Sequence, residues 1–423
     1  MSGTAGGLPG WAWRQWRSLR PSTRRSVWTA VGALNARFPR RYNRVLQVPS
    51  FFGSWIDLEA AFPLLLLHLF RARRSWRPTD AQGAVTAALD AASAASYVSF
   101  IAEGRATDEQ FIAALAPYLG DKDLADRPQS VRLGAWFPLL YGGRKRRLRT
   151  RGIVFSPEGH AHRLRLDVYQ PTVPWDGAGV RRPAIVQIHG GGWVLGDKRE
   201  QGIPLLNHLA ANGWVGFNVN YTLSPRGKAP QHLIDCKAAI AWIRDHADEY
   251  GIDPDFICVT GGSAGGHLAT MVALTANDPA FQPGFEDKDT SVAAAVPFYA
   301  AYDLVDEEHL MIRGFRQLLV EPVMFGSKYA DGPESFQAYS PQYRANADAP
   351  PMLLIHGTRD TLIPIEVARR FARTLSDVSD HAVIYAELYG ANHAFDIFPS
   401  ARTVRTIEYV ERFLDGVRRG VIK

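Results

Sequence analysis

The sequence predicts an α/β protein, in which a mostly parallel central sheet carries helices on both faces and follows a helical N-terminal arm. Short β-rich runs alternate with helical segments in the C-terminal two thirds, and their continuous apolar strands indicate a parallel sheet covered on both faces. Before them, residues 80–128 place apolar side chains at helical spacing. The β-rich runs are RLRLDVY, PAIVQIHGGGW, WVGFNVNY, DFICVTGGS, VAAAVPFY, PMLLIHG and HAVIYAELYG. The helical segments are 198–211, 229–249, 263–276, 364–376 and 401–418.

The bulk composition is that of a folded globular protein. The chain has 423 residues, of which 46% are hydrophobic and 21% are charged, so it can bury a full core. Its two cysteines, Cys236 and Cys258, sit within apolar runs. Such surroundings predict buried thiols rather than a disulfide framework, redox chemistry or a metal site.

Changes in charge and in the spacing of apolar residues divide the chain into three predicted parts. These are a basic arm over 1–80, a helical cap or linker over 81–150, and an α/β domain over 151–423. The first ten residues, MSGTAGGLPG, indicate a flexible tail. The stretch 142–151 (GGRKRRLRTR) combines glycines with a charge run and predicts a boundary. Residues 163–169 alternate in the manner of an edge strand.

The arm differs from the rest of the chain in charge. Residues 1–150 contain 22 Lys and Arg against 10 Asp and Glu, whereas the remainder contains 26 against 32. Residues 11–80 also hold six tryptophans and thirteen arginines, a pairing that suits an anionic membrane interface. A helical arm that packs its tryptophans onto the α/β domain remains the alternative. No nucleic-acid module is recognisable, so nucleic acid is not an expected partner.

The sequence does not predict a transmembrane helix or a cleaved signal peptide. Residues 51–70 are the most apolar segment considered, but they contain Asp57, Glu59, Pro63 and His68. The pair Arg24-Arg25 precedes only a short apolar stretch, which is a weak match to an export signal. The expected location is therefore the cytoplasm or the periphery of a membrane.

The first candidate for chemistry is the serine in Gly261-Gly262-Ser263-Ala264-Gly265. This G-x-S-x-G pattern stands between the β-rich run FICVT and the helical GHLATMVALTA. A nucleophilic serine on a sharp strand-to-helix turn needs small neighbours, because larger side chains would collide there.

The second candidate is the glycine run in His189-Gly190-Gly191-Gly192-Trp193, which ends another β-rich run. Glycines allow backbone N–H groups to approach a developing oxyanion, and one such donor stabilises the transition state by roughly 3 kcal/mol. We expect the N–H of Ala264, at the start of the helix after Ser263, to complete this oxyanion hole.

The third candidate is an acid and base pair, Asp360 and His393, each of which follows a strand. Ser263, Asp360 and His393 have the chain order that a nucleophile, acid and base take on this kind of sheet. The rivals are Asp303 as the acid, Asp396 as a supporting partner or helix cap, His356 as a structural turn residue, and His267 as a residue hydrogen-bonded locally.

Residues 152–420 resemble the hormone-sensitive-lipase-like bacterial carboxylesterases of the α/β-hydrolase fold, through HGGGW, GGSAGGHLA, HGTRDTLIP and GANHAF. The segment YTLSP followed by a helix with Asp235 is also similar. The resemblance implies these roles: nucleophile Ser263, acid Asp360, base His393, and oxyanion donors Gly191, Gly192 and Ala264, with His189, Gly190, Trp193, Gly261 and Gly265 as supporting motif residues.

The resemblance also implies a cap, formed by N-terminal helices within 80–140 and by an insertion near 303–348. One departure is Gly262, where the family commonly has an acidic residue. The expected function is a serine carboxylesterase for short- to medium-chain, even lipid-derived, esters, without a metal or organic cofactor. An arylformamidase, amidase or thioesterase on the same triad, and a non-catalytic hydrolase-fold binding protein, are the alternatives.

Overall fold

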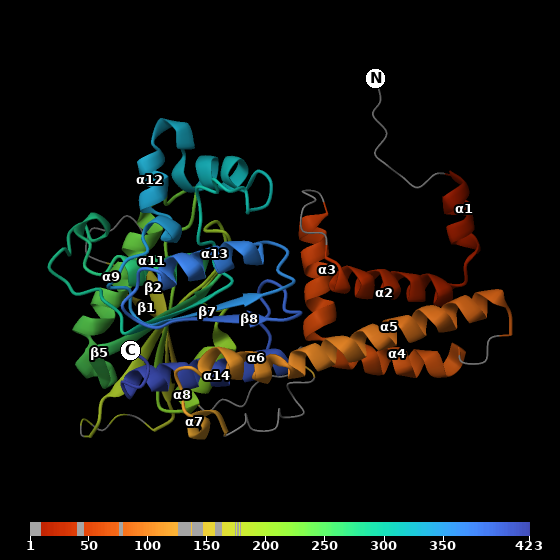
Figure 1. Cartoon of the computed structure of the whole chain (residues 1–423), viewed down its shortest axis with the longest axis horizontal. Coiled ribbons are helices and arrows are strands. Elements are labelled where there is room, and N and C mark those ends of the chain that lie inside the picture. Colours follow the sequence, from red (N-terminus) through yellow and green to blue (C-terminus); the bar gives the residue numbers. More distant parts are fainter. Residues whose placement is uncertain are drawn as a thin grey trace.

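A computed structural model of the chain describes residues 10–39, 46–75, 79–125, 137, 147–156, 163–173, 175, 177 and 179–423. Three sequence predictions concern residues outside these ranges: the tail up to residue 9, Trp76, and residues 142–146 of the predicted boundary. The described residues form an α/β domain and a helical arm that projects from one side of it (Figure 1).

The centre of the α/β domain is an eight-stranded sheet with the strand order β1-β2-β4-β3-β5-β6-β7-β8. Strand β2 pairs antiparallel with β1 and with β4, and all other neighbours are parallel, as the sequence predicted. The strands are β1 (Arg147–Val154), β2 (Arg165–Pro171), β3 (Arg182–Ile188), β4 (Val215–Val219), β5 (Ile252–Gly262), β6 (Ala294–Phe298), β7 (Met352–Gly357) and β8 (Val383–Leu388).

One prediction about the start of the sheet is wrong. The run within 163–169 is not an edge strand, because β2 has a partner on each side. The edge strand is β1, which begins inside the charged stretch predicted to be a boundary. Its charge is compatible with an edge position, where charged side chains discourage pairing with other molecules. One of them is also neutralised, since Arg149 donates a 2.8 Å hydrogen bond to the buried Asp167 of β2.

Helices cover both faces of the sheet (Figure 1). The strands send alternate side chains to two separate cores; in β7, Leu354 faces one and Leu353 the other. The first core includes Ile240 of α9, Leu268 of α11 and Phe371 of α13. The second is closed by α8 and α14. The helices of this domain are α8 (Ile203–Ala211), α9 (Gln231–Asp245), α10 (Ala247–Tyr250), α11 (Ala264–Leu274), α12 (Pro333–Ala338), α13 (Ile365–Ser376) and α14 (Ala401–Arg418), together with a π-helix (Arg316–Phe325).

The predicted helices lie where the sequence placed them, apart from their ends. Helix α14 has the predicted bounds, whereas α8 begins at Ile203, after turns over the preceding residues. The predicted helix over 229–249 is broken at His246, which separates α9 from α10. The two cysteines are free and buried, as predicted.

The N-terminal part is entirely helical where it is described. Its helices are α1 (Gly10–Ser18), α2 (Pro21–Arg37), α3 (Gln47–Glu59), α4 (Ala61–Ser75), α5 (Ala81–Arg105), α6 (Thr107–Leu115) and α7 (Asp121–Ala125). Helices α2, α4 and α5 lie side by side in the projecting arm, with α1 at its free tip (Figure 1). Helix α6 instead joins the second core of the α/β domain, where the ring of Phe111 stacks on Tyr409 of α14 at 5.1 Å.

By length and composition, one described helix, Ala81–Leu115, could cross a membrane. The core helix of a soluble protein can pass the same test, so this helix by itself is weak evidence. The segment 51–70 is divided between α3 and α4, which meet at an angle of 81°. It therefore forms no straight span, although the bent pair Gln47–Glu59 and Ala61–Arg73 is together long and apolar enough to be a broken span or a re-entrant loop.

Candidate active site

The turn that carries Ser263 joins β5 to α11 and is strained. Ser263 has φ 59° and ψ −121°, a conformation that side-chain-bearing residues rarely adopt. Its backbone N–H donates a 3.0 Å hydrogen bond to the carbonyl of Phe298 at the end of β6, which holds the turn against the sheet. The side chain is partly exposed, so a substrate can reach the hydroxyl.

The glycines beside Ser263 are required by contact distances. A Cβ at Gly261 would lie 2.7 Å from the carbonyl oxygen of Ile188, and one at Gly265 would lie 2.7 Å from that of His189. Gly262 explains the departure from the family pattern, because a Cβ there would lie 2.6 Å from the hydroxyl of Tyr299. Tyr299 therefore occupies the space that an acidic side chain at position 262 would need.

The glycine run after β3 lies directly against the serine turn. A Cβ at Gly190 would be 2.5 Å from the carbonyl oxygen of Gly262 and 3.1 Å from the Cβ of Ser263. Gly191 and Gly192 have φ values of 115° and 62°, which glycine adopts without a steric penalty. The structure thus brings the predicted oxyanion donors next to the predicted nucleophile, with Ala264 as the first residue of α11.

His189 and Trp193 are the two residues that flank the glycine run, and both are buried. The N–H of Gly190 is occupied by Gln201 at 2.7 Å, which leaves the next two residues of the loop as the donors to consider. His189 stacks on Tyr221 at 4.5 Å, and burial lowers the pKa of its imidazole. Trp193 is buried and its carbonyl accepts a 2.8 Å hydrogen bond from Ser224.

Asp360 and His393 form a buried pair in which His393 Nδ1 lies 2.7 Å from Asp360 Oδ2. The other carboxylate oxygen accepts hydrogen bonds of 2.8 Å from the backbone N–H groups of Leu362 and Ile363. Burial would raise the pKa of Asp360, but His393 and a contact from His356 hold it well below its usual range. The carboxylate is therefore ionised at neutral pH and fixed in orientation.

Tyr299 connects the serine turn to the histidine. It follows β6 with φ 37°, its ring lies 4.5 Å from that of His393, and its hydroxyl fills the space beside Gly262. The hydroxyl donates a short hydrogen bond to Asp396, whose pKa is raised by burial. The same residue thus contacts the histidine and the serine turn, although no sequence motif singled it out.

The rival residues have structural partners. Asp303 Oδ1 accepts from the N–H groups of Val305 and Asp306, and its other oxygen pairs with Arg370 at 2.7 Å. The prediction of a turn residue for His356 is wrong: it lies within β7, with its Nε2 2.9 Å from the carbonyl of Ile363 and 3.3 Å from Asp360 Oδ2. The prediction of a local hydrogen bond for His267 is wrong: its partner is the carbonyl of Tyr339, 72 residues away, because α11 packs against the segment before β7.

The sequence also missed a contact from the arm. Helix α3 lies against the loop of His393, where Trp55 donates a 2.9 Å hydrogen bond to the carbonyl of Ala394. Ser54 accepts a 2.8 Å hydrogen bond from Asn392, whose amide oxygen in turn accepts from the backbone N–H of His393 at 2.8 Å. Because these contacts join residues more than 300 positions apart, no local pattern could reveal them.

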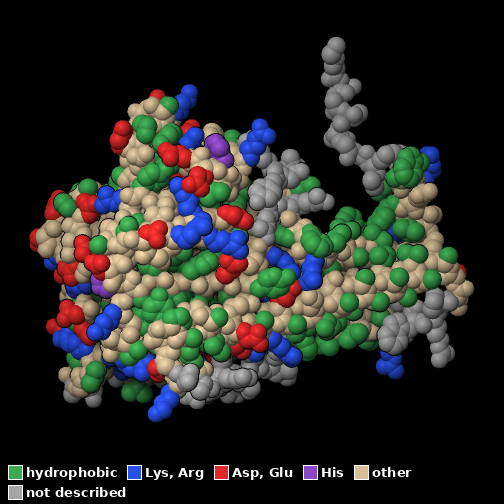
Figure 2. Space-filling model, viewed as in Figure 1, with side chains coloured by type: hydrophobic (Ala, Val, Ile, Leu, Met, Phe, Trp, Pro, Cys, Tyr) green, Lys and Arg blue, Asp and Glu red, His purple; other side chains and the backbone are tan. Residues whose placement is uncertain are grey.

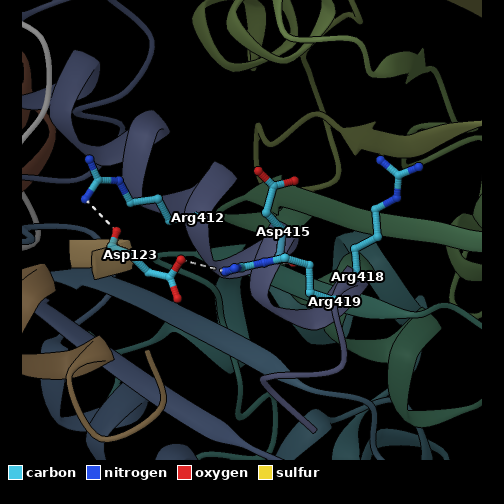
Figure 3. Close-up of a pocket in the computed structure, with 5 residues that line it drawn as sticks. All are labelled: Asp123, Arg412, Asp415, Arg418 and Arg419. Carbon is cyan, nitrogen blue, oxygen red and sulfur yellow. Dashed lines mark hydrogen bonds and ion pairs between the residues drawn. The ribbon is translucent and has the colours of Figure 1, made fainter. Parts of the chain in front are cut away.

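A cavity of about 510 Å³ lies elsewhere, between the end of α14 and α7 (Figure 3). Its lining is charged and self-paired, since Asp123 bonds Arg419 at 3.0 Å and Arg412 donates to the carbonyl of Asp123. None of the candidate catalytic side chains lines it. Among the described residues, no group of three or more His, Cys, Asp or Glu is arranged to hold a metal ion.

The fold, with Ser263 on the strand-to-helix turn after β5 and the buried His393–Asp360 pair, defines the class as an α/β hydrolase. The family described as BD-FAE matches residues 166–375. Over 407 residues, 92% of this chain and 91% of the relative, the chain is 39% identical to the probable carboxylic ester hydrolase LipM of Mycobacterium tuberculosis. It is 42% identical to the esterase LipQ of the same organism, over 65% of this chain and 64% of the relative.

The chain therefore belongs to this hormone-sensitive-lipase-like family of carboxylic ester hydrolases, and it is a carboxylesterase. The structure of esterase 2 of Thermogutta terrifontis is similar with a TM-score of 0.54 and 28% identity, over 64% of this chain and 92% of that one. Other structures of that esterase hold propionate or butyrate.

Proposed function

We propose that this carboxylesterase hydrolyses esters of short- to medium-chain acids, with Ser263 as nucleophile, His393 as general base and Asp360 as the carboxylate that orients it. The observation that carries the proposal is the 2.7 Å contact between His393 and an ionised, doubly N–H-bonded Asp360. Tyr299 links this pair to the strained turn of Ser263, because its ring lies 4.5 Å from that of His393 and its hydroxyl lies beside Gly262.

In the first half of the reaction, Ser263 Oγ attacks the ester carbonyl while His393 Nε2 takes its proton. Asp360 keeps the Nδ1 proton of His393 pointed toward itself, so the Nε2 lone pair faces the serine. The tetrahedral intermediate then collapses, the C–O bond breaks, and His393 returns the proton to the leaving alcohol. In the second half, water attacks the acyl-serine with the same base, which releases the acid and restores Ser263.

The negative oxygen of each tetrahedral intermediate is stabilised by the N–H groups of Gly191, Gly192 and Ala264. The position of Ala264 at the start of α11 supports this role, because the first N–H groups of a helix lack intrahelical partners and carry partial positive charge. The occupied N–H of Gly190 supports the choice of the following two glycines.

Leu319, in the π-helix of the insertion between β6 and β7, supports an apolar wall beside the oxyanion loop. A Cβ at Gly192 would lie 3.9 Å from Leu319 Cδ2, which is ordinary van der Waals contact. The propionate- and butyrate-bound forms of the Thermogutta esterase support the short end of the acyl range.

The test is hydrolysis of p-nitrophenyl esters from acetate to palmitate by the intact protein and by Ser263→Ala. We expect a maximum between acetate and the medium chains, and a loss of kcat on the order of 10⁴-fold or more in the variant. A preference for palmitate would contradict the acyl range. Unchanged activity of Ser263→Ala would contradict the assignment of the nucleophile. If formamide or thioester analogues were cleaved much faster than every ester, the alternative substrate classes would replace this one.

A further inference from the structure

The helices of the arm expose many apolar side chains and bury several polar ones, in contrast to the α/β domain. They also share a small apolar core of Ala36, Leu58, Ala61, Tyr97 and Phe100. Helix α4 shows the contrast most simply. Leu66, Leu67, Leu69 and Phe70 are exposed, whereas His68, the single polar residue between Ala61 and Phe70, is 2% exposed. In water, an amphipathic helix would show the opposite pattern.

Helix α5 repeats this pattern over most of its length. Between residues 84 and 102, its exposed residues are all alanine or valine: Ala84, Val85, Ala88, Ala91, Ala92, Ala95, Val98 and Ala102. Its buried residues over the same stretch include Thr86, Asp90 and Ser93. At 1.5 Å per residue this apolar surface is about 27 Å long, close to the hydrocarbon thickness of about 30 Å in a bilayer.

Helix α2 behaves in the same way. Its exposed face presents Trp28, Val31 and Leu34, and Thr23 and Ser26 point inward. In the space-filling view, hydrophobic side chains cover the visible face of the arm, whereas charged side chains are spread over the α/β domain (Figure 2).

The buried polar side chains join the helices to one another. Thr23 and Thr86 lie 2.8 Å apart, and Ser26 donates a 2.7 Å hydrogen bond to Asp90. Small residues such as Ala33 and Ala36 are also buried at these contacts. Small residues and interhelical hydrogen bonds hold helices together in hydrocarbon, where burying apolar side chains offers no advantage.

Exposed charged side chains lie at the two ends of the arm. In the helix segments toward the tip, the exposed charged residues are Arg14, Arg17, Arg20, Arg25, Arg71, Arg73 and Asp80, of which Arg20 pairs with Asp80. Trp11 and Trp13 are exposed on α1 beside them. At the base, Arg37 pairs with Glu103 at 2.9 Å, and Glu103 also binds Arg359 of the α/β domain. Arginine and tryptophan at the border of an apolar surface match the headgroup level of a bilayer.

We propose that the arm enters a lipid bilayer end on, with the outward faces of α2, α4 and α5 in the hydrocarbon and the arginines of the tip at headgroup phosphates. This is a deeper insertion than the surface association that the sequence suggested. The α/β domain, with its charged surface, stays in water at the base of the arm and is anchored there.

The test uses the full chain with a single environment-sensitive label. Val98, 54% exposed in the middle of α5, is replaced by cysteine and labelled with a nitrobenzoxadiazole dye; the matched control is Val378→Cys on the α/β domain, 45% exposed. Cys236 and Cys258 stay unlabelled, because they are buried and burial raises the pKa of both thiols.

With phosphatidylcholine vesicles in high salt, we expect the V98C label to shift its emission to shorter wavelength. Bromine atoms in the middle of the acyl chains should quench it several-fold, and the V378C label should not respond. Binding that depended only on surface charge would need anionic lipid and would be lost in salt. V98C emission that did not respond to neutral vesicles would therefore overturn the proposal.

A second measurement is extraction of membranes with alkaline carbonate. The wild-type protein should remain in the pellet, whereas Leu66→Glu with Leu69→Glu should move it to the supernatant with p-nitrophenyl esterase activity retained. The matched control, Val173→Glu with Val180→Glu, charges two exposed valines of the α/β domain and should stay in the pellet. A blue-shifted V98C label without any lipid, in a protein that is dimeric in detergent-free buffer, would show that a second copy covers the arm and would also overturn the proposal.

Discussion

The arm and the α/β domain follow opposite rules for which side chains face outward. In the domain, Val186, Leu268 and Phe371 are fully buried, and apolar burial of this kind stabilises a fold in water. In the arm, Asp90 and Ser93 are buried and Leu66 and Val98 are exposed. This difference in the exposed surface is what supports the proposal that the arm lies in a bilayer while the α/β domain lies in water.

The two regions meet at α3, and there they are not independent. This helix packs against α2 and α4 of the arm, and it also contacts the loop of His393 in the α/β domain. Phe51 is part of the second core, and its ring lies 6.2 Å from that of His393. His393, the proposed general base, is thus held partly by residues that the sequence assigned to a separate arm.

The largest expected effect concerns the chemistry of the domain alone. Asp360→Asn removes the charge that fixes the tautomer of His393, and we expect kcat to fall on the order of 10⁴-fold. The measurement is p-nitrophenyl butyrate hydrolysis at saturating substrate. Asp303→Asn is the control, because its partner is Arg370 rather than a histidine. An equal loss of kcat in both variants would contradict the role of Asp360 as the carboxylate that orients His393.

The next prediction compares a glycine from each region. Gly265→Ala places a Cβ against the backbone of Ile188 and His189, and we expect a loss of about 3 kcal/mol in the free energy of unfolding. Gly104→Ala in α5 has no atom within 4 Å of the new Cβ and should be neutral or stabilising by about 0.5–1 kcal/mol. Urea denaturation in the presence of detergent measures both. Equal losses in the free energy of unfolding for the two variants would contradict the prediction that Gly265 is tightly packed and Gly104 is not.

The third prediction concerns the pH dependence of the domain. Burial lowers the pKa of His267 to about 4, below its unfolded value of about 6.5. The unfolded chain therefore binds the proton first, so stability is complete above pH 6.5 and declines by up to about 1.4 kcal/mol per pH unit as the pH falls toward 4.

His267→Gln, which keeps a donor for the carbonyl of Tyr339, should flatten this decline. Unfolding midpoints in urea at pH 7 and pH 5 measure it. The exposed His381→Gln serves as the control and should leave the slope as in the wild type. A slope that is the same in all three proteins would contradict the prediction.

The smallest expected effect tests the junction. Ser54→Ala removes the acceptor of the Asn392 amide, and we expect kcat to fall by up to about 10-fold, corresponding to about 1.4 kcal/mol. Because Ser54 is not at the tip or on the exposed faces, carbonate extraction should be unchanged. The control is Ser96→Ala, whose hydroxyl bonds only within α5. Unchanged kcat in Ser54→Ala would show that α3 does not influence the position of His393.

The sequence determined most of the fold and the identity of the candidate site residues, because these depend on local patterns. These patterns each lie within a short stretch of the sequence. They are apolar runs of strand length, apolar residues at helical spacing, and the glycine motifs around Ser263 and Gly191. The relative order of Ser263, Asp360 and His393 follows from the topology of the sheet, so it was also predictable.

The remaining features could not be predicted from local patterns, since each depends on contacts between segments that are distant in the sequence. Gly262 is explained by Tyr299 and the loop of His393 is supported by Ser54, although neither partner is nearby in sequence. The reversed packing of the arm was equally inaccessible, because an alanine-rich helix such as α5 shows no clear apolar stripe. Which of its faces is outward is set by the polar contacts of its neighbours, and these form only when the helices assemble.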